Sequence, residues 1–139
     1  MTEVGKTLKI TIPGNPTPWS RAGKAGKHHY TKPAMAASQR LIAWNTIQQV
    51  GQMTLTGPLE VSIVFGLAIP ASWSRKRTQE ALDGRTRHTG KPDVDNLAKQ
   101  VLDALNGVLW QDDAQVVDLH ERKIYAEHPS TIIQVRSLA

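Results

Sequence analysis

The sequence KPDVDNLAKQVLDALNGVLWQDDAQVVDL, residues 91–119, contains a helix signal followed closely by a strand signal, and these two signals decide the fold class. Its first half spaces apolar residues three and four positions apart, as an amphipathic helix does: Leu97, Val101, Ala104 and Leu105. Asp93 can cap the start of this helix, and Asn106-Gly107 is a typical helix stop. After Asp112-Asp113 the chain enters a run of strand-forming residues, which predicts a strand.

Outward from this stretch, alternation of apolar and polar residues predicts strands, and spacings of three and four predict a second long helix. The predicted elements are a strand at 8–12, a helix at 33–50, a strand at 58–68, a short helical piece near 75–82, and two final strands at 115–125 and 131–137, joined by a turn at 127–130. The apolar stripe expected on helix 33–50 consists of Ala37, Leu41, Trp44, Ile47 and Val50. Residues 13–32, rich in Gly and Pro, are expected to form an exposed loop.

These elements predict one domain over residues 1–139, of the α/β (α+β) class, with a mixed β-sheet flanked by helices. The expected order is strand, helix, strand, helix, strand, strand. A chain of 139 residues is long enough to bury its own core. It has no Cys, which excludes disulfides, thiolate nucleophiles and Cys-type zinc sites. With no secretory signal and no apolar run of about 20 residues, we expect a cytoplasmic protein without a membrane partner.

The charges are unevenly distributed along the chain, although the total is only +5. Residues 13–32 carry four bases and no acid, and residues 75–91 carry six bases and two acids, so each segment has a net charge of +4. Residues 92–121 carry seven acids and one Lys, a net charge of −6. Basic segments suit a polyanion, and acids close to them suit a divalent cation that lies between carboxylate and phosphate. The alternative is an ordinary solvated surface.

Asp93 and Asp95 flank a helix start, where two carboxylates can share one Mg²⁺, a cation that prefers oxygen ligands. Lys99 follows one helical turn later and could stabilise charge that develops on a phosphate. Asp112-Asp113 comes close enough in sequence to fold back against the first pair. The structural alternative is equally open from spacing alone: helix caps for the first pair, an i,i+4 partner of Asp95 and Asp103 for Lys99, and turn residues for the second pair.

Residues 91–119 resemble the signature of the RusA family of Holliday junction resolvases, which are endonucleases widespread in prophages. The shared elements are D-x-D-N-L-x-K, D-A-L and W-x-D-D-x-Q-V. This resemblance implies essential acids at Asp93, Asp95 and Asp113, which would also be the metal ligands, and an essential lysine at Lys99. It further implies a Mg²⁺-dependent homodimer, with Mn²⁺ as a possible substitute, that cuts branched DNA such as Holliday junctions in recombination, repair or phage DNA debranching.

Several further residues are candidates for contact with DNA or with a second subunit. By position, those expected to contact the DNA backbone are Arg21, Arg75, Arg77 and Lys91. Trp19 either inserts at a branch point or covers an edge of the core. For the dimer surface, the candidates are apolar parts of the strand at 58–68 and Trp110, which has a place in the core as its alternative. The alternatives for the whole protein are a general branched-DNA or flap nuclease, or a non-catalytic DNA-binding protein.

Overall fold

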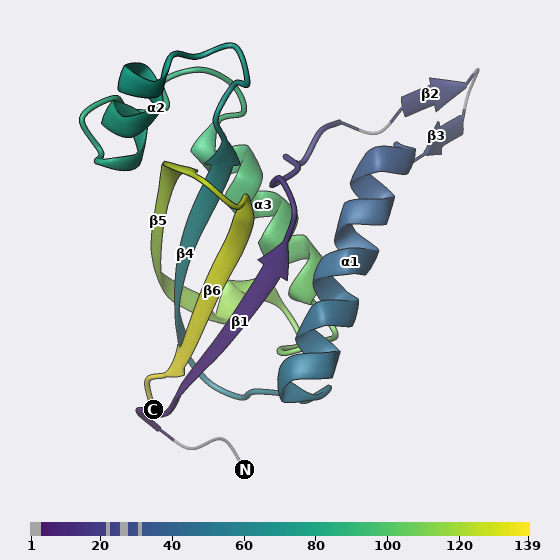
Figure 1. The fold of residues 1–139 in the computed structure, drawn as a ribbon. Coiled ribbons are helices and arrows are strands. Elements are labelled where there is room, and N and C mark those ends of the chain that lie inside the picture. The colour runs from purple at the N-terminus through teal and green to yellow at the C-terminus, as the bar shows by residue number, and fades with distance from the viewer. Residues whose placement is uncertain (1–3, 22, 26–27, 31) are drawn as a thin grey trace.

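A mixed four-stranded sheet with two long helices on one face forms the body of the protein, as Figure 1 shows for a computed structural model. The structure describes residues 4–21, 23–25, 28–30 and 32–139. The sheet strands are β1 Thr7–Pro13, β4 Leu59–Ala68, β5 Val116–Ala126 and β6 Ser130–Ser137. The helices are α1 Pro33–Val50, α2 Arg75–Leu82 and α3 Val94–Leu105, with a single 3₁₀ turn, η1, at Asp113–Gln115. The predicted fold class and order of main elements are confirmed.

The strand order is β1-β6-β4-β5, so β5 is an edge strand and β4 is central. β6 pairs antiparallel with both β1 and β4, whereas β4 and β5 are parallel. β5 and β6 follow each other in the chain but lie on opposite sides of β4, so the turn between them crosses the end of that strand. The parallel pair needs a crossover connection, and α3 belongs to it. α3 therefore begins near the end of β5 and finishes near its start.

The core lies between the sheet and the helices. Buried apolar side chains come from all the main elements except β5, although α2 contributes only Ala81 among the described residues. Those at 0–1% exposure include Ile10, Val61, Ile63, Phe65, Leu97, Leu105 and Ile133. Trp110 joins this core, since it is 1% exposed and its Nε1 donates a hydrogen bond of 2.7 Å to Asn106 Oδ1. Burying a large apolar side chain contributes about 1.5–3 kcal/mol. Trp110 is therefore wrong as a dimer-surface candidate, because it is core. The inward side of β4 is core as well, and a dimer contact through exposed apolar parts of that strand stays a prediction.

α1 has the predicted bounds, but a different face of it is buried. Met35, Ile42 and Thr46 point inward, whereas Leu41 and Trp44 are 45% and 59% exposed. α1 packs on β1 and α3, and part of that contact is polar: the buried Gln100 of α3 donates 2.9 Å to the Met35 carbonyl and accepts from Gln39. The expected stripe was wrong because amide side chains and Thr occupy the inward face.

The loop predicted at 13–32 contains two short strands that the sequence pattern did not indicate. They are β2 Gly23–Ala25 and β3 His28–Tyr30, which pair antiparallel in a sheet of their own (Figure 1). The side chains of His28 and His29 lie outside what the structure describes, so the exposure expected for this part of the loop stays a prediction. Among the described helices, none has the length and apolarity to cross a membrane.

Candidate active site

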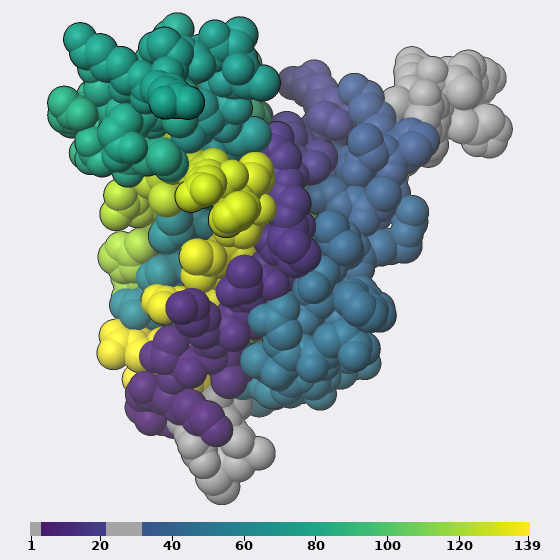
Figure 2. All heavy atoms as spheres, viewed as in Figure 1, coloured from purple at the N-terminus to yellow at the C-terminus, as the bar shows by residue number. Residues whose placement is uncertain are grey.

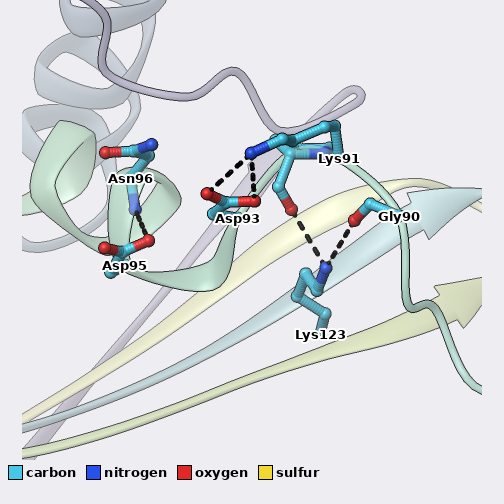
Figure 3. Close-up of polar contacts among 7 residues, drawn as sticks. Gly90, Lys91, Asp93, Asp95, Asn96 and Lys123 are labelled. Atoms are coloured by element: carbon cyan, nitrogen blue, oxygen red, sulfur yellow. Dashed lines mark hydrogen bonds and ion pairs between the residues drawn. The ribbon is translucent and has the colours of Figure 1, made fainter.

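Asp93 and Asp95 project from the start of α3, close to the ends of β4 and β5. Asp93 is the N-cap residue, but its carboxylate does not cap the helix; it pairs with Lys91, whose Nζ lies 2.9 Å from each carboxylate oxygen (Figure 3). Asp95 is exposed, and its Oδ1 accepts a 2.9 Å hydrogen bond from the backbone N–H of its neighbour Asn96. The simple capping role for Asp93 is therefore wrong, and both carboxylates face a surface that solvent reaches.

Lys123 of β5 holds the segment that leads into Asp93. Its Nζ donates hydrogen bonds of 2.9 Å to the Gly90 carbonyl and 3.0 Å to the Pro92 carbonyl. Figure 3 shows the Lys123 side chain pointing from its strand toward Gly90. A charged donor shared by two carbonyls makes a strong anchor. Sequence reasoning missed Lys123, since no local pattern links it to a loop about 30 residues earlier. The consequence is that the end of β5 and the first acid are structurally tied.

Glu121 is a second residue of the site, after Lys123, that sequence reasoning missed. It pairs in register with Ile63, so its side chain lies on the helix-covered face of the sheet, toward α3. Burial raises the pKa of Glu121, and the charge of Asp95 raises it further, so the two carboxyl groups lie within electrostatic range of each other. Among the described residues, Glu121 Oε2 is buried and has no hydrogen-bond partner. Two close carboxylates with an unpartnered buried oxygen form a donor set that suits a hard divalent cation.

Asp112 and Asp113 have different local roles. Asp112 caps η1, because its Oδ1 accepts from the Ala114 N–H at 2.9 Å and Gln115 Oε1 accepts in return from the Asp112 N–H at 3.3 Å. This reciprocal capping box accounts for Asp112 structurally. Asp113 is left as the half-buried acid of the pair. Burial raises the pKa of Asp113, and the neighbouring Asp112 and the charge of Asp103 raise it further, against a lowering contribution from Asn106.

Asp113 lies at the opposite end of α3 from Asp93 and Asp95. Its neighbours Asp103 and Asn106 are at the last turn of the helix. Asn106 comes eleven positions after Asp95, which corresponds to a rise of about 16 Å along the helix. Within the described part of a single chain, no group of three acids or histidines is arranged to hold a metal ion. The expectation that the second pair folds back against the first is thus not met in one chain, because α3 keeps the two pairs apart.

Lys99 is exposed on α3 one turn after Asp95, and its ammonium lies over an aromatic ring. Its Nζ is 3.7 Å from the ring centroid of Trp19. The backbone N–H of Trp19 donates a 2.9 Å hydrogen bond to the Asn96 carbonyl. The structure places the half-buried Trp19 ring against the candidate lysine. Insertion at a branch point and cover for an edge of the core both stay predictions.

The basic segment 75–91 forms a lobe beyond the end of the sheet, seen in teal in Figure 2. Arg77 stacks 3.7 Å above the Trp73 ring, which contacts Tyr125 of β5 with ring centroids 5.1 Å apart. The His88 ring packs on the same tyrosine, with ring centroids 5.0 Å apart, and His88 is half-buried. Three of the four predicted DNA contacts are exposed on this segment, namely Arg75, Arg77 and Lys91, of which Lys91 pairs with Asp93. Arg21 is exposed on the loop that carries Trp19.

Two comparisons with known proteins identify the family of the chain. A model of the Endodeoxyribonuclease RusA family matches residues 13–136, which is nearly the whole chain. "Uncharacterized protein YqaN" from Bacillus subtilis (strain 168) is 34% identical over 138 residues, and the alignment covers 95% of this chain and 97% of that protein.

Proposed function

The chain belongs to the endodeoxyribonuclease RusA family, and from this membership we propose that it is a Mg²⁺-dependent endonuclease that resolves four-way DNA junctions by paired phosphodiester hydrolysis. The observation that carries the proposal is the family match over residues 13–136, which includes every candidate residue of the site. The basic lobe beside Asp93 supports it, since phosphate needs positive charge close to the acids.

The cation would be held by Asp93 and Asp95, with Glu121 beside them. The feature that suits a bound cation is the buried Glu121 oxygen, which has no hydrogen-bond partner among the described residues and lies in the electrostatic range of Asp95. Bound Mg²⁺ supplies charge neutralisation of the phosphate and a more acidic water. Lys91 now pairs with Asp93, and it would turn to a DNA phosphate when the acid takes a metal. Lys99 would stabilise the charge that develops on the scissile phosphate as water bonds to phosphorus and the sugar oxygen leaves.

The third acid would come from a second copy of the chain, because Asp113 is too far from Asp93 in its own chain. β5 is the surface that supports a dimer: it has eleven residues, an unpaired outer edge, and two exposed apolar side chains, Val117 at 60% and Leu119 at 39%. An open edge of this kind is a template for pairing with another strand. Antiparallel pairing centred on His120 would also set each Asp118 opposite Arg122 of the second copy.

Antiparallel pairing of the two β5 edges would bring the start of one strand to the end of the other. Asp113 directly precedes β5, whereas Asp93 lies near its end, tied there by Lys123 and the Pro92 carbonyl. Each Asp113 would therefore approach the Asp93-Asp95 pair of the other chain. A two-fold dimer of this kind has two identical sites, which matches the two symmetric cuts needed at a four-way junction.

The test is a panel of labelled DNAs, namely duplex, flap, fork and four-way junction, incubated with Mg²⁺, Mn²⁺ or EDTA. We expect paired cuts in the junction only when a divalent metal is present. Asp93→Asn, Asp95→Asn and Asp113→Asn should each abolish cleavage and keep junction binding, because the basic segments carry the affinity. Cleavage by Asp93→Asn at the normal rate contradicts the assignment. Equal cutting of flaps and forks would favour a general branched-DNA nuclease, and binding without cleavage a non-catalytic protein.

A further inference from the structure

The ammonium of Lys99 has an aromatic partner although acidic partners are available on the same helix. Asp95 and Asp103 lie four residues before and after Lys99, the spacing at which Lys and Asp attract each other on a helix. The Nζ atom instead lies 3.7 Å from the Trp19 ring centroid. The ring face attracts a cation but carries no net charge, so it does not offset the positive charge of the lysine. A carboxylate partner would offset that charge.

The Trp19 ring is held on a well-anchored stretch of backbone. The backbone N–H of Trp19 donates a 2.9 Å hydrogen bond to the Asn96 carbonyl in the first turn of α3, and the backbone N–H of the next residue, Ser20, donates to Met35 Sδ of α1 at 3.1 Å. Pro16 is buried and Pro18 directly precedes the tryptophan, and proline restricts the backbone angle φ. The ring is thus tied to the turn of α3 that carries Asp95.

We propose that Trp19 is a positioning residue: its indole holds the Lys99 ammonium away from Asp95 and Asp103, charged and ready to accept a DNA phosphate. The proposal rests on the proposed function, in which Lys99 stabilises the scissile phosphate. Without the ring, the ammonium forms an ion pair with Asp95 or Asp103, and this pair has to break before each cut. Trp19 therefore affects the rate of cleavage and leaves the affinity for the junction nearly unchanged.

The first test is single-turnover cleavage of a four-way junction with Mg²⁺, together with the junction Kd in EDTA. Trp19→Leu should lower the cleavage rate constant about tenfold, with a Kd within about twofold of the original, whereas Trp19→Phe, which keeps a ring, should stay within about threefold in rate. The double variant Trp19→Leu/Lys99→Ala should cut as slowly as Lys99→Ala alone. Trp44→Leu, a change on the exposed face of α1, is the matched control and should cut normally.

Equal rates for Trp19→Leu and the unaltered protein would overturn the proposal, and so would effects of Trp19→Leu and Lys99→Ala that multiply. A second test does not depend on activity. In NMR spectra, the Lys99 side-chain protons should show an upfield ring-current shift that disappears in Trp19→Leu and persists in Trp44→Leu. Absence of the shift in the unaltered protein overturns the contact itself. If the shift is present but the unaltered protein cuts no branched DNA with Mg²⁺, the proposed function fails, and the catalytic part of this inference fails with it.

Discussion

Glu121 on β5 and Asp95 on α3 lie within electrostatic range of each other, and one Glu121 oxygen is buried with no hydrogen-bond partner in the described part of the chain. The two acids are 26 positions apart in the sequence, and they come into range because α3 packs beside the edge strand. Like charges at short range oppose each other, and a divalent cation removes that repulsion. The contact therefore links the candidate metal site to β5, the strand proposed to form the dimer.

Glu121→Gln should weaken Mg²⁺ and Mn²⁺ binding by about 10–100-fold, because it removes a negative group beside Asp95. Without metal, the same change should leave the free energy of unfolding unchanged or raise it, since it relieves repulsion. Calorimetric metal titration and thermal unfolding in EDTA measure the two effects. Glu127→Gln, an exposed acid in the turn after β5, is the matched control. Unchanged metal affinity in Glu121→Gln would exclude Glu121 from the site.

Mixing two inactive variants should restore cleavage if the site is shared between chains. In a mixed dimer of Asp113→Asn and Asp95→Asn chains, one site combines an intact Asp95 with an intact Asp113, and the other site has both defects. If half the dimers are mixed, about a quarter of all sites become functional, and the product is mainly a nick in one strand. A site built within one chain predicts no recovery at all. The measurement is junction nicking after co-refolding of the two variants.

Val117→Lys should weaken dimer formation, because it puts a charge at the open edge of β5. Light scattering after size-exclusion chromatography would report a shift toward monomer, with a parallel loss of cleavage. The control is Leu41→Lys, which adds the same charge to the exposed apolar face of α1, and we expect it to stay dimeric. The opposite result, with Leu41→Lys monomeric and Val117→Lys dimeric, would move the dimer surface from β5 to α1.

Asp112→Ala should lower the free energy of unfolding by about 1 kcal/mol, since it removes the cap of η1. Asp112→Asn keeps an oxygen that can accept from the Ala114 N–H, so we expect it to be nearly as stable as the original protein. Chemical denaturation of both variants makes the comparison. Equal losses in the two variants would mean that the charge of Asp112, rather than its hydrogen bond, matters.

His88 should make the protein less stable as the pH falls below the ordinary histidine pKa of 6.5. Burial lowers the pKa of His88, and the positive charge of Lys123 lowers it further, so the folded state binds fewer protons than the unfolded state. The free energy of unfolding therefore decreases as the pH drops from 6.5 toward the lowered value. His88→Phe keeps a ring against Tyr125 and should flatten this slope in urea titrations between pH 7 and 5. An unchanged slope would assign the effect to other groups.

Local patterns were sufficient for most of the elements. α1 and α2 have the bounds that the spacing predicted, and α3 stops at Asn106-Gly107, where Gly107 adopts a positive φ of 78° that suits glycine. These features depend on neighbours within a few residues. The burial of α1 was mispredicted because two adjacent stripes exist on that helix, and only the packed partner decides which one is covered.

The sequence by itself determined the family, the order of the main elements and the motif that contains Asp93, Asp95, Lys99 and Asp113, because all of these are written in short-range spacing. Only the tertiary structure decided which side chains meet. In that structure, the length of α3 separates Asp113 from Asp95, and Glu121 lies in the electrostatic range of Asp95. The Lys99 ammonium lies over the Trp19 ring. The physical reason is that a rigid helix and a parallel crossover fix distances between distant residues, and no local pattern records those distances.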